Sequence, residues 1–373
     1  MDRFPNRVEI DHAALRHNLM QVRSLIPSGT EITAVVKADA YGHGMVEAAR
    51  TLEAAGAERL AVAHLAEGVR LRKAGVSCPV VVLCGILTRD EAGAVLDHDL
   101  IPVLSGPAPA AVLSDEGRRR GKRSRVQLKI DTGMGRLGVP AARAGAFVEE
   151  VLKMDGLNAE GLVSHLSSAD EPDRGFTESQ IRAFEDALEA AREKGMDAGA
   201  SSLANSAGTL GYPKAHFGMI RPGILLYGGS PSPELIPSIS LEPAMTLKAT
   251  VLQVRDFPRG APISYGRTYT TTGSERIAVI SAGYSDGLSR LLSNRGQVLI
   301  GGERTPIRGR VCMNLTMADV SRLPGVRPGD EAVFLGRQGD AVLTGDQVAA
   351  ACDTISYEIY CAVGRCGEKT TIS

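Results

Sequence analysis

Short apolar runs alternate with amphipathic segments from residue 31 to about residue 228 of the chain. Eight of the runs have the length and the apolar, β-branched content of buried strands: EITAVVKAD, RLAVAHL, PVVVLCG, LIPVLS, RVQLKID, LNAEGLVSHL, GASSLANS and MIRPGILLYG. Most segments between them, such as FTESQIRAFEDALEAAREKG, carry apolar residues at helical spacing. Apolar strands that alternate with helices are typical of a parallel sheet. Eight such units predict a closed (β/α)8 barrel of the TIM type.

The pattern changes after SPSPELIPS, a stretch rich in Pro and Ser at residues 230–238. The chain then reads as strands joined by Gly, Pro and Asp turns, and a helical pattern runs from about Thr344 to Tyr360. We therefore predict a fold of the α/β plus β class with two domains. The barrel is expected at residues 1–234, and a mostly β-strand C-terminal domain at residues 235–373.

Composition and charge exclude several classes of protein. The chain has 373 residues, of which 43% are apolar and 23% charged, and its net charge is −1 at pH 7. This balance is ordinary for a globular protein and indicates neither a nucleic-acid partner nor an anionic membrane surface. No apolar run approaches the roughly 20 residues that a membrane span needs. Charged residues are scattered through the first 20 positions, where a signal peptide needs an apolar core, so we expect a cytoplasmic protein.

Two local features, the cysteines and a basic run, carry little functional information. The six cysteines show no paired metal-ligand spacing, so we predict free thiols and no metal site. The basic run RRRGKRSR at residues 118–125 is either the solvated end of a helix or a contact for a polyanion. It lacks the interleaved aromatic residues that favour the second interpretation.

Five polar residues stand at or just beyond the carboxyl ends of predicted barrel strands: Lys37, Arg136, His165, Ser206 and Arg221. Active sites of such barrels lie at this face, so we expect the five side chains to meet at one mouth. A lysine there is either a paired cation or a Schiff-base lysine whose pKa is lowered by burial or by a neighbouring cation.

The loops after the seventh and eighth predicted strands favour the Schiff-base interpretation of the lysine. They contain ANS (204–206) and RPGI (221–224) and offer a hydroxyl, backbone N–H groups and a glycine. These groups together suit a phosphate. A phosphate-binding site that lies across the barrel from a reactive lysine predicts pyridoxal 5'-phosphate as the cofactor, with its aldehyde bound to Lys37.

The stretch AVVKADAYGHG, residues 34–44, closely resembles the cofactor signature of the bacterial alanine racemases. The likeness continues in the expected order through KIDTGMGRLG, SHLSSAD, ANSAG, RPGILLYG, ISYGRTY, AGYSDG, GRVCMN and ISYEI. The resemblance implies a cytoplasmic, pyridoxal-phosphate-dependent isomerase that interconverts L-alanine and D-alanine and supplies D-alanine for peptidoglycan and cell wall biogenesis. It also implies the fold predicted above and a homodimer with composite active sites.

The resemblance assigns two catalytic bases. Lys37 would hold the cofactor and act on the substrate face used for D-alanine, and the partner subunit's Tyr265 would act on the face used for L-alanine. Two bases on opposite faces let one proton leave and another arrive without rotation of the planar intermediate. A free tyrosine titrates at about pH 10. In the family a histidine and an arginine lie behind this tyrosine, and they correspond to His165 and Arg221.

Arg221 resembles the arginine that the family has at the pyridine nitrogen of the cofactor. A guanidinium donates a hydrogen bond and cannot accept a proton, so the ring withdraws fewer electrons and transamination is disfavoured. A decarboxylase of the same fold has a carboxylate at this position, and Arg221 argues against that alternative. A second alternative is a broader amino-acid racemase that acts on serine and alanine, although such proteins are typically exported.

Substrate and cofactor contacts are implied by the same motifs. Arg136 would bind the alanine carboxylate with its planar fork, and the backbone of the partner subunit's Met313 would bind it as well. Lys129 is similar to a lysine that some members carbamylate, and an unmodified paired lysine is the alternative. The residues implied around the cofactor are Tyr41, His165, Asn205, Ser206, Arg221, Gly223, Ile224 and Tyr357.

The entrance to the site is expected to be narrow. Tyr357 and the partner subunit's Tyr284 would leave room for little beyond a methyl side chain. Because one methylene group changes discrimination by only about 1–3 kcal/mol, we expect some turnover of serine. Asn314 stands where the family commonly has Asp, which changes the charge of the entry path but not the chemistry.

Two further hypotheses come from other classes of protein. A non-enzymatic pyridoxal-phosphate carrier is a lone barrel, and the residues after 238, with Tyr265 and Met313, would then have no purpose. A Schiff-base aldolase needs no cofactor, and the phosphate-binding site and the tyrosine motif argue against it.

Overall fold

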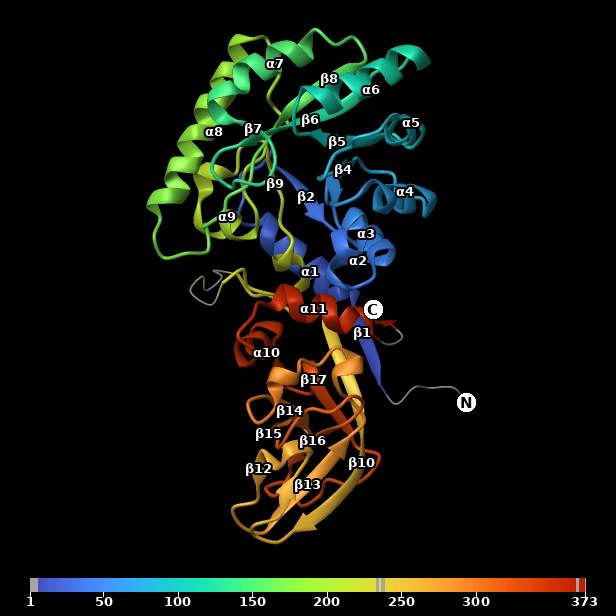
Figure 1. Cartoon of the computed structure of the whole chain (residues 1–373), viewed down its shortest axis with the longest axis vertical. Coiled ribbons are helices and arrows are strands. Elements are labelled where there is room, and N and C mark those ends of the chain that lie inside the picture. The colour runs from blue at the N-terminus through green and yellow to red at the C-terminus, as the bar shows by residue number, and fades with distance from the viewer. Residues whose placement is uncertain (1–5, 233–234, 236–238, 367–368, 373) are drawn as a thin grey trace.

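The computed structural model describes residues 6–232, 235, 239–366 and 369–372. Figure 1 shows two bodies along the long axis, a barrel surrounded by helices and a second body built mainly from strands, with helices α10 (Gly345–Ala351) and α11 (Ser356–Arg365) between them. The predicted boundary between residues 234 and 235 lies beside residues outside the described ranges. All six cysteines are free thiols, as predicted. Within the described ranges, no helix is long and apolar enough to cross a membrane.

The barrel is a ring of parallel strands. Its order is β2, β3, β4, β5, β6, β8, a one-residue bridge at Ser202, and β9, which pairs again with β2. The strands are β2 (Glu31–Val35), β3 (Arg59–Val62), β4 (Val80–Val82), β5 (Leu100–Leu104), β6 (Ser124–Asp131), β8 (Leu157–Val163) and β9 (Met219–Ile220), and β7 (Val139–Pro140) adds to β6. This closed ring confirms the predicted (β/α)8 barrel.

The seventh predicted strand, GASSLANS, is reduced to Ser202, which bridges Val163 on β8 and Met219 on β9. The backbones approach closely here, because a Cβ on Gly161 would lie 2.2 Å from the carbonyl oxygen of Ala200. Only glycine fits such a position. The barrel therefore closes through a close backbone approach and not through a full strand ladder.

Helices cover the outside of the barrel and bury their apolar faces against it. They are α1 (His12–Arg23), α3 (Met45–Ala54), α4 (Leu65–Lys73), α5 (Arg89–Asp97), α6 (Pro107–Arg120), α7 (Ala144–Leu152), α8 (Gly175–Glu193) and α9 (Ser206–Gly211), with the 3-10 helices η1 (Ala141–Arg143), η2 (Pro213–Ala215) and η3 (Ile224–Tyr227). In α8, Ile181, Phe184 and Leu188 are buried at the helical spacing that the sequence predicts. Helix α5 begins after Thr88, whose hydroxyl accepts a hydrogen bond from the N–H of Glu91.

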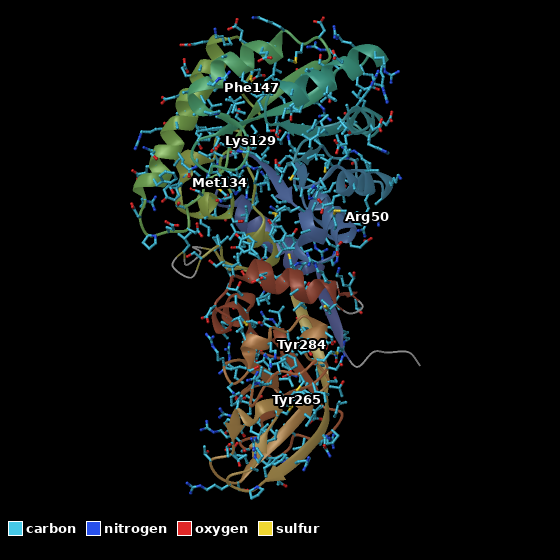
Figure 2. The ribbon with its side chains drawn as sticks, in the orientation of Figure 1. Arg50, Lys129, Met134, Phe147, Tyr265 and Tyr284 are labelled. Atoms are coloured by element: carbon cyan, nitrogen blue, oxygen red, sulfur yellow. The ribbon has the colours of Figure 1, made fainter. Side chains whose placement is uncertain are left out.

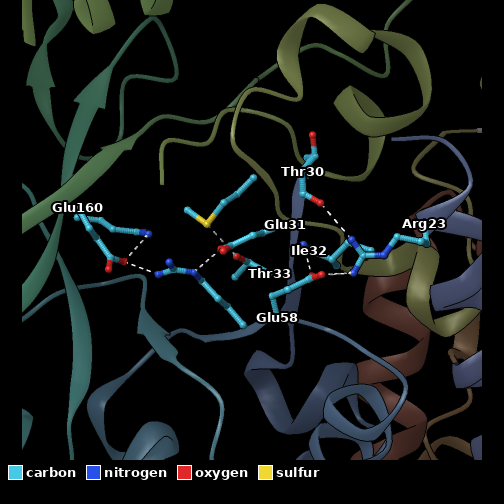
Figure 3. Close-up of polar contacts among 10 residues, drawn as sticks. Arg23, Thr30, Glu31, Ile32, Thr33, Glu58 and Glu160 are labelled. Carbon is cyan, nitrogen blue, oxygen red and sulfur yellow. Dashed lines mark hydrogen bonds and ion pairs between the residues drawn. The ribbon is translucent and has the colours of Figure 1, made fainter. Parts of the chain in front are cut away.

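Charged side chains link several barrel strands (Figure 3). Glu31 and Arg59 are the first residues of β2 and β3, whereas Lys37 follows the other end of β2. Arg59 opens β3 and donates to Glu31 on β2 at 2.7 Å and also to Glu160 on β8. Gln127 on β6 donates to the same Glu160 carboxylate at 3.3 Å. Four strands of the ring are therefore joined by one polar network at this end.

The second body contains a nine-stranded sheet with the order β15-β14-β17-β10-β1-β19, onto which β13, β16 and β18 pair. Its strands are β1 (Arg7–Asp11), β10 (Met245–Phe257), β13 (Glu275–Ile280), β14 (Gln297–Ile300), β15 (Glu303–Pro306), β16 (Thr316–Asp319), β17 (Glu331–Gln338), β18 (Ala341–Leu343) and β19 (Lys369–Ile372). A separate pair, β11 (Pro262–Ile263) and β12 (Tyr269–Thr270), accompanies the 3-10 helices η4 (Tyr265–Arg267), η5 (Tyr284–Asp286) and η6 (Arg290–Leu292).

Strand β1 belongs to this second sheet, although it comes first in the chain. It pairs antiparallel with β10 and parallel with β19. The predicted barrel range, residues 1–234, therefore includes a strand that lies in the other body. The N-terminal segment connects the two bodies, because β1 in the second sheet leads directly into α1 beside the barrel.

Helix α11 packs on the barrel mouth through a contact between two glycines. A Cβ on Gly364 would lie 2.1 Å from the carbonyl oxygen of Gly42, and a Cβ on Gly42 would lie 2.4 Å from the carbonyl oxygen of Tyr360. The helical pattern predicted from Thr344 to Tyr360 is thus two helices, of which α11 carries Tyr357 to the barrel.

Candidate active site at the barrel mouth

A cavity of about 370 Å³ lies at the carboxyl ends of the barrel strands. Its lining includes all five residues that were predicted to meet there: Lys37, Arg136, His165, Ser206 and Arg221. The lining also includes Tyr41, Lys129, Asn205, Gly223, Ile224 and Tyr357. The structure thus brings together every residue that the motifs imply around the cofactor, together with Arg136 and Lys129.

The charge of the cavity is strongly one-sided. Lys37, Lys129, Arg136 and Arg221 are basic, and none of the residues that line the cavity is acidic, all of them being within the described ranges. Clefts lined by one sign of charge concentrate ligands of the opposite sign. A phosphate group and an amino-acid carboxylate are both suited to this lining.

Lys37 stands at the head of an unusual backbone turn, labelled α2 (Lys37–Tyr41). Ala38, Asp39, Ala40 and Tyr41 all have φ between 54° and 56°, a left-handed conformation that costs roughly 1–2 kcal/mol per non-glycine residue. The glycines of this stretch come only afterwards, at Gly42 (φ 86°) and Gly44 (φ 88°). Sequence propensity therefore misses this turn.

Surrounding groups hold the left-handed turn. The N–H of Ala38 donates to Oε1 of Glu67 at 2.8 Å, and the N–H of Met45 donates to Oδ1 of Asp39 at 2.9 Å. Strained backbone of this kind persists where its environment over-determines it, and such places cluster at functional sites. The turn holds Lys37 and Tyr41 at the cavity.

Burial lowers the pKa of Lys37 below its ordinary value, and the positive charge of Arg136 lowers it further. The neutral form of the amine is therefore more accessible than in a free lysine, which is what a nucleophile or a general base requires. Arg136 itself is exposed where it lines the cavity, so its guanidinium can reach a carboxylate there.

Arg221 is buried and organises the polar floor of the site. It donates to the hydroxyl of Ser202 and to the carbonyl oxygen of Ser164, and its Nη2 lies 3.4 Å from Nδ1 of His165. Burial lowers the pKa of Arg221 to about 10, so the guanidinium keeps its proton at neutral pH. Ser202 and Ser164 were missed by sequence reasoning. The available signals were the serine pair at the start of GASSLANS, for Ser202, and the position directly before His165 in LNAEGLVSHL, for Ser164.

The loops after β9 and before α9 form the predicted phosphate region. The N–H of Gly223 donates to Oγ of Ser206 at 3.0 Å. The side chain of Asn205 is occupied within the chain, because its Oδ1 accepts from the N–H of Gly208 at 2.9 Å and its Nδ2 donates to the carbonyl oxygen of Leu166 at 3.1 Å. Asn205 is therefore suited to shaping this loop.

The lining fits pyridoxal 5'-phosphate by its chemistry. Lys37 offers an amine for an aldehyde, and Arg221 offers N–H donors and no acceptor. A Cβ on Gly223 would lie 2.3 Å from the phenol oxygen of Tyr41, so only glycine leaves room for this close approach. Burial raises the pKa of the Tyr41 phenol, which therefore stays protonated and can donate to a phosphate oxygen.

Tyr265, Met313 and Tyr284 do not line this cavity but lie on the second body. Figure 2 shows Tyr265 and Tyr284 there, and Lys129 in the barrel. Tyr265 is 72% exposed, Met313 is 56% exposed and Tyr284 is 44% exposed. The N–H of Tyr284 donates to the carbonyl oxygen of Cys312 at 2.9 Å, which ties two of these loops together. The second body thus presents a separate set of predicted site residues to solvent.

Backbone geometry holds Tyr265 outward. Ser264 before it has φ 62° and its Oγ donates to the carbonyl oxygen of Arg310 at 2.7 Å. Nearby, Nδ2 of Asn314 donates to Oγ of Ser285 at 2.8 Å. The asparagine at this position is therefore used in a local hydrogen bond of the exposed loop. Among the described residues, no group of three or more His, Cys, Asp or Glu side chains is arranged to hold a metal ion.

Comparisons with known proteins match both bodies. A family model described as the N-terminal domain of alanine racemase matches residues 10–231, and one described as the C-terminal domain matches residues 244–370. The alanine racemase of Syntrophobacter fumaroxidans is 45% identical, over 96% of this chain and 95% of its own length. That of Halothermothrix orenii is 42% identical, over 97% of this chain and 95% of its own length.

Solved structures agree with these matches. The alanine racemase from D-cycloserine producing Streptomyces lavendulae has a TM-score of 0.93 and 34% identity, and the match covers 100% of this chain and 98% of that one. The alanine racemase from Bacillus anthracis with bound L-Ala-P has a TM-score of 0.86 and 33% identity, with 100% of this chain and 96% of that one covered.

Proposed function

The chain belongs to the alanine racemase family and interconverts L-alanine and D-alanine, and we propose that it does so by a two-base mechanism with pyridoxal 5'-phosphate bound at Lys37. The observation that carries this proposal is the presence of Lys37 and the Arg221–His165 pair in one cavity without acidic lining residues. The protein is an isomerase by its family.

Lys37, Tyr41, Ser206 and Gly223 would hold the cofactor, the lysine at its aldehyde and the other three around its phosphate. When bound, pyridoxal 5'-phosphate supplies a conjugated ring that spreads the negative charge left on Cα after proton removal. Arg221 would face the ring nitrogen as a hydrogen-bond donor, because a guanidinium has no acceptor and keeps its own proton. This choice of residue disfavours the decarboxylase alternative, for which a carboxylate is needed.

Lys37 would be the base for one face of alanine. Its pKa is lowered by burial and then by Arg136, which makes the neutral amine, the form that accepts the α-proton, more accessible than in a free lysine. Lys37 is the first residue of the left-handed turn, and this turn would fix the backbone of the lysine before the substrate binds. Preorganised catalytic groups react without further reorganisation.

Tyr265 would be the base for the other face and would come from a second copy of the chain. It is 72% exposed on its own subunit and lies outside that subunit's cavity. A base must be deprotonated when it acts, and a cationic environment favours the deprotonated form of a phenol such as that of Tyr265. Arg221, acting through His165, would supply that environment in the partner's cavity. The active protein would therefore be a homodimer with composite sites.

Arg136 and the backbone of the partner subunit's Met313 would bind the substrate carboxylate. Tyr357 and the partner subunit's Tyr284 would narrow the entrance to the size of a methyl side chain. The Bacillus anthracis relative was solved with L-Ala-P, which supports a small amino-acid ligand here. A cytoplasmic enzyme of this kind would supply D-alanine for peptidoglycan.

Exchange of the α-hydrogen of alanine in deuterated water, with cofactor supplied, tests the proposal. Lys37→Ala should abolish exchange from both enantiomers, and Tyr265→Phe should slow exchange from L-alanine more than from D-alanine. The matched control is Lys153→Ala, an exposed residue directly after α7, which should behave as the wild type. Undiminished exchange from L-alanine in Tyr265→Phe would exclude the two-base assignment. An absorbance band at about 420 nm that borohydride removes would report the lysine–aldehyde link.

Substrate breadth separates the remaining alternative, a broader racemase of serine and alanine. D-amino-acid formation should be measured from a panel of L-amino acids. Alanine should be preferred over serine by about 10–200-fold, the range that one small side-chain group provides. Equal rates for the two substrates would favour the broader racemase.

A further inference from the structure

Lys369, on the C-terminal strand β19, forms an ion pair with Asp39 inside the left-handed turn that follows Lys37. The two residues are 330 positions apart in the chain. Oδ2 of Asp39 binds the lysine, while Oδ1 accepts from the N–H of Met45 at 2.9 Å. Oδ1 also lies 3.9 Å from Nη1 of the exposed Arg70 on α4. Oδ2 is therefore bound from the second body's sheet, whereas the contacts of Oδ1 come from the barrel side.

The turn depends on contacts of this kind because its residues are not glycines. Ala38 to Tyr41 all lie in the left-handed region, where a side chain is unfavourable unless surrounding groups compensate. Glu67 holds the start of the turn through the N–H of Ala38. Asp39, the next residue of the turn, is held by Lys369. The side chain of Lys369 is 26% exposed and that of Asp39 is 37% exposed. A partly desolvated, charge-assisted pair is stronger than an exposed one.

The position of the pair points to cofactor binding. Lys37 and Tyr41, the two ends of the turn, both line the cavity, whereas Lys369 does not. Strand β19 is fixed by parallel pairing with β1, with Val8 opposite Lys369. The lysine thus presents a fixed positive charge to the outer side of the turn, from an element that takes no part in the barrel.

We propose that Lys369 is a positioning residue for cofactor binding: through Asp39 it holds the left-handed turn that carries Lys37 and Tyr41 to the cavity. This inference rests on the proposed role of Lys37. It adds a residue from the C-terminal strand to the reaction, and it makes the binding of pyridoxal 5'-phosphate depend on the docking of that strand.

Titration of the cofactor-free, full-length protein with pyridoxal 5'-phosphate, followed by absorbance, tests the proposal. Lys369→Gln should weaken cofactor affinity by about tenfold or more, and Lys369→Arg should restore affinity to within about threefold, since it keeps the charge. The matched control is Lys248→Gln. Lys248 lies in the same sheet, is 19% exposed and pairs with Glu9 at 2.9 Å, but it does not touch the turn.

Thermal unfolding of each cofactor-free variant separates positioning from general stability. Lys369→Gln and Lys248→Gln should lower the midpoint by similar amounts, while only Lys369→Gln loses affinity. Unchanged affinity in Lys369→Gln, or an equal loss in Lys248→Gln, overturns the inference while leaving the proposed function intact. A wild type that binds no cofactor overturns both.

A second variant keeps the test decisive where Lys369→Gln does not fold. Asp39→Asn removes the charge but leaves an oxygen for the N–H of Met45. It should weaken cofactor affinity to a similar extent, and the double variant should be no worse than either single one, because the two residues act as one unit. Full additivity of the two losses would overturn the inference.

Discussion

Arg221 donates a hydrogen bond from Nη2 to Nδ1 of His165, across 3.4 Å. Because a guanidinium has no acceptor, Nδ1 of the histidine must carry a lone pair. Burial lowers the pKa of His165 well below its ordinary value, and the charge of Arg221 lowers it further. The imidazole is therefore neutral at pH 7, and its proton is on Nε2.

Removal of this donor should affect both the chemistry and the histidine. Arg221→Gln should lower the rate of racemisation by about 10²-fold or more, since it removes a buried, preorganised donor set. The pKa of His165 should rise toward its ordinary value, because the neighbouring positive charge is gone. Steady-state rates in both directions and a proton NMR titration of His165 measure these effects.

The control for this variant is Arg182→Gln, an exposed arginine on α8. It should leave both the rate and the histidine titration as in the wild type. An unchanged titration of His165 in Arg221→Gln would contradict the assigned geometry even where activity is lost.

Two inactive variants should complement each other if the sites are composite. Co-expression of Lys37→Ala with Tyr265→Phe should restore activity to about a quarter of wild type, since half of the dimers are hybrids and each hybrid has one intact site. Co-expression of Lys37→Ala with Arg221→Gln is the control. Both of these residues line the same cavity of one subunit, so no hybrid has an intact site. Activity in both mixtures, or in neither, would argue against a Tyr265 from the partner.

Much of the candidate site could be predicted from local sequence patterns. Lys37 and His165 reach the cavity because each follows an apolar strand, and the carboxyl ends of parallel strands share one face of a barrel. The motifs ANSAG and RPGILLYG likewise indicate Ser206 and Gly223, which also line the cavity. Local patterns of this kind carry the residue type and its place on the strand together.

The rest of the site depends on contacts between distant parts of the chain. Strand β1 lies in the second sheet because its partners, β10 and β19, come more than two hundred residues later. The left-handed turn follows from compensating contacts, since no propensity scale favours four such residues in a row. The pair of Asp39 and Lys369 joins positions 330 apart and leaves no local pattern in the sequence.

Lys129 should react reversibly with carbon dioxide. Burial, followed by the charge of Arg221, lowers its pKa to about 7, so the neutral amine is well populated above neutral pH. Attack of this amine on carbon dioxide forms an N–C bond and releases one proton, which leaves a negative carbamate. At a fixed concentration of dissolved carbon dioxide, the carbamate should increase as the pH rises through about 7 and disappear in acid.

Carbon-13 NMR with labelled carbon dioxide measures this modification directly. Lys129→Met should lack the carbamate signal, whereas the exposed Lys153→Gln should retain it. Absence of the signal at every pH from the wild type would leave Lys129 as an unmodified amine that donates to the carbonyl oxygen of Ile130.

Glu116 should stabilise the barrel in a pH-dependent way. Its side chain is 1% exposed and accepts hydrogen bonds from Arg119, Arg89 and Arg120. Arg119 and then Arg89 hold the pKa of this carboxyl well below its ordinary value of 4.5. The folded state therefore binds fewer protons than the unfolded state, and the contribution of Glu116 is present above pH 4.5 and lost as the pH falls below it.

Urea unfolding of Glu116→Gln against wild type, at neutral pH and in acid, tests this dependence. The variant should be less stable at neutral pH, and the difference should shrink below pH 4.5. Asp115→Asn is the control, because the Asp115–Arg118 pair is 67% and 61% exposed and such pairs contribute about 0–1 kcal/mol. On this interpretation, arginines of the basic run at residues 118–125 have a structural role as partners of Glu116. A stability difference between Glu116→Gln and the wild type that does not change with pH would contradict this role.

Arg59 should stabilise the fold without affecting catalysis. Its side chain is 12% exposed and pairs with Glu160, which is 14% exposed, at the opposite end of the barrel from Lys37. Arg59→Met leaves that carboxylate desolvated without its cation, which should lower the free energy of unfolding by about 3 kcal/mol. Arg192→Met is the control, because the Arg192–Glu189 pair is exposed and its loss should cost under about 1 kcal/mol.

The companion change at Glu160 identifies the cause of the loss. Arg59→Met combined with Glu160→Gln should recover part of the lost stability, since the desolvated charge of Glu160 is then gone, whereas Glu31, the other partner of Arg59, is 39% exposed and stays hydrated. Racemisation per folded molecule should match the wild type in all of these variants, because the network lies away from the cavity. A large loss of activity in a variant that is fully folded would contradict this expectation and would show that the two ends of the barrel are coupled.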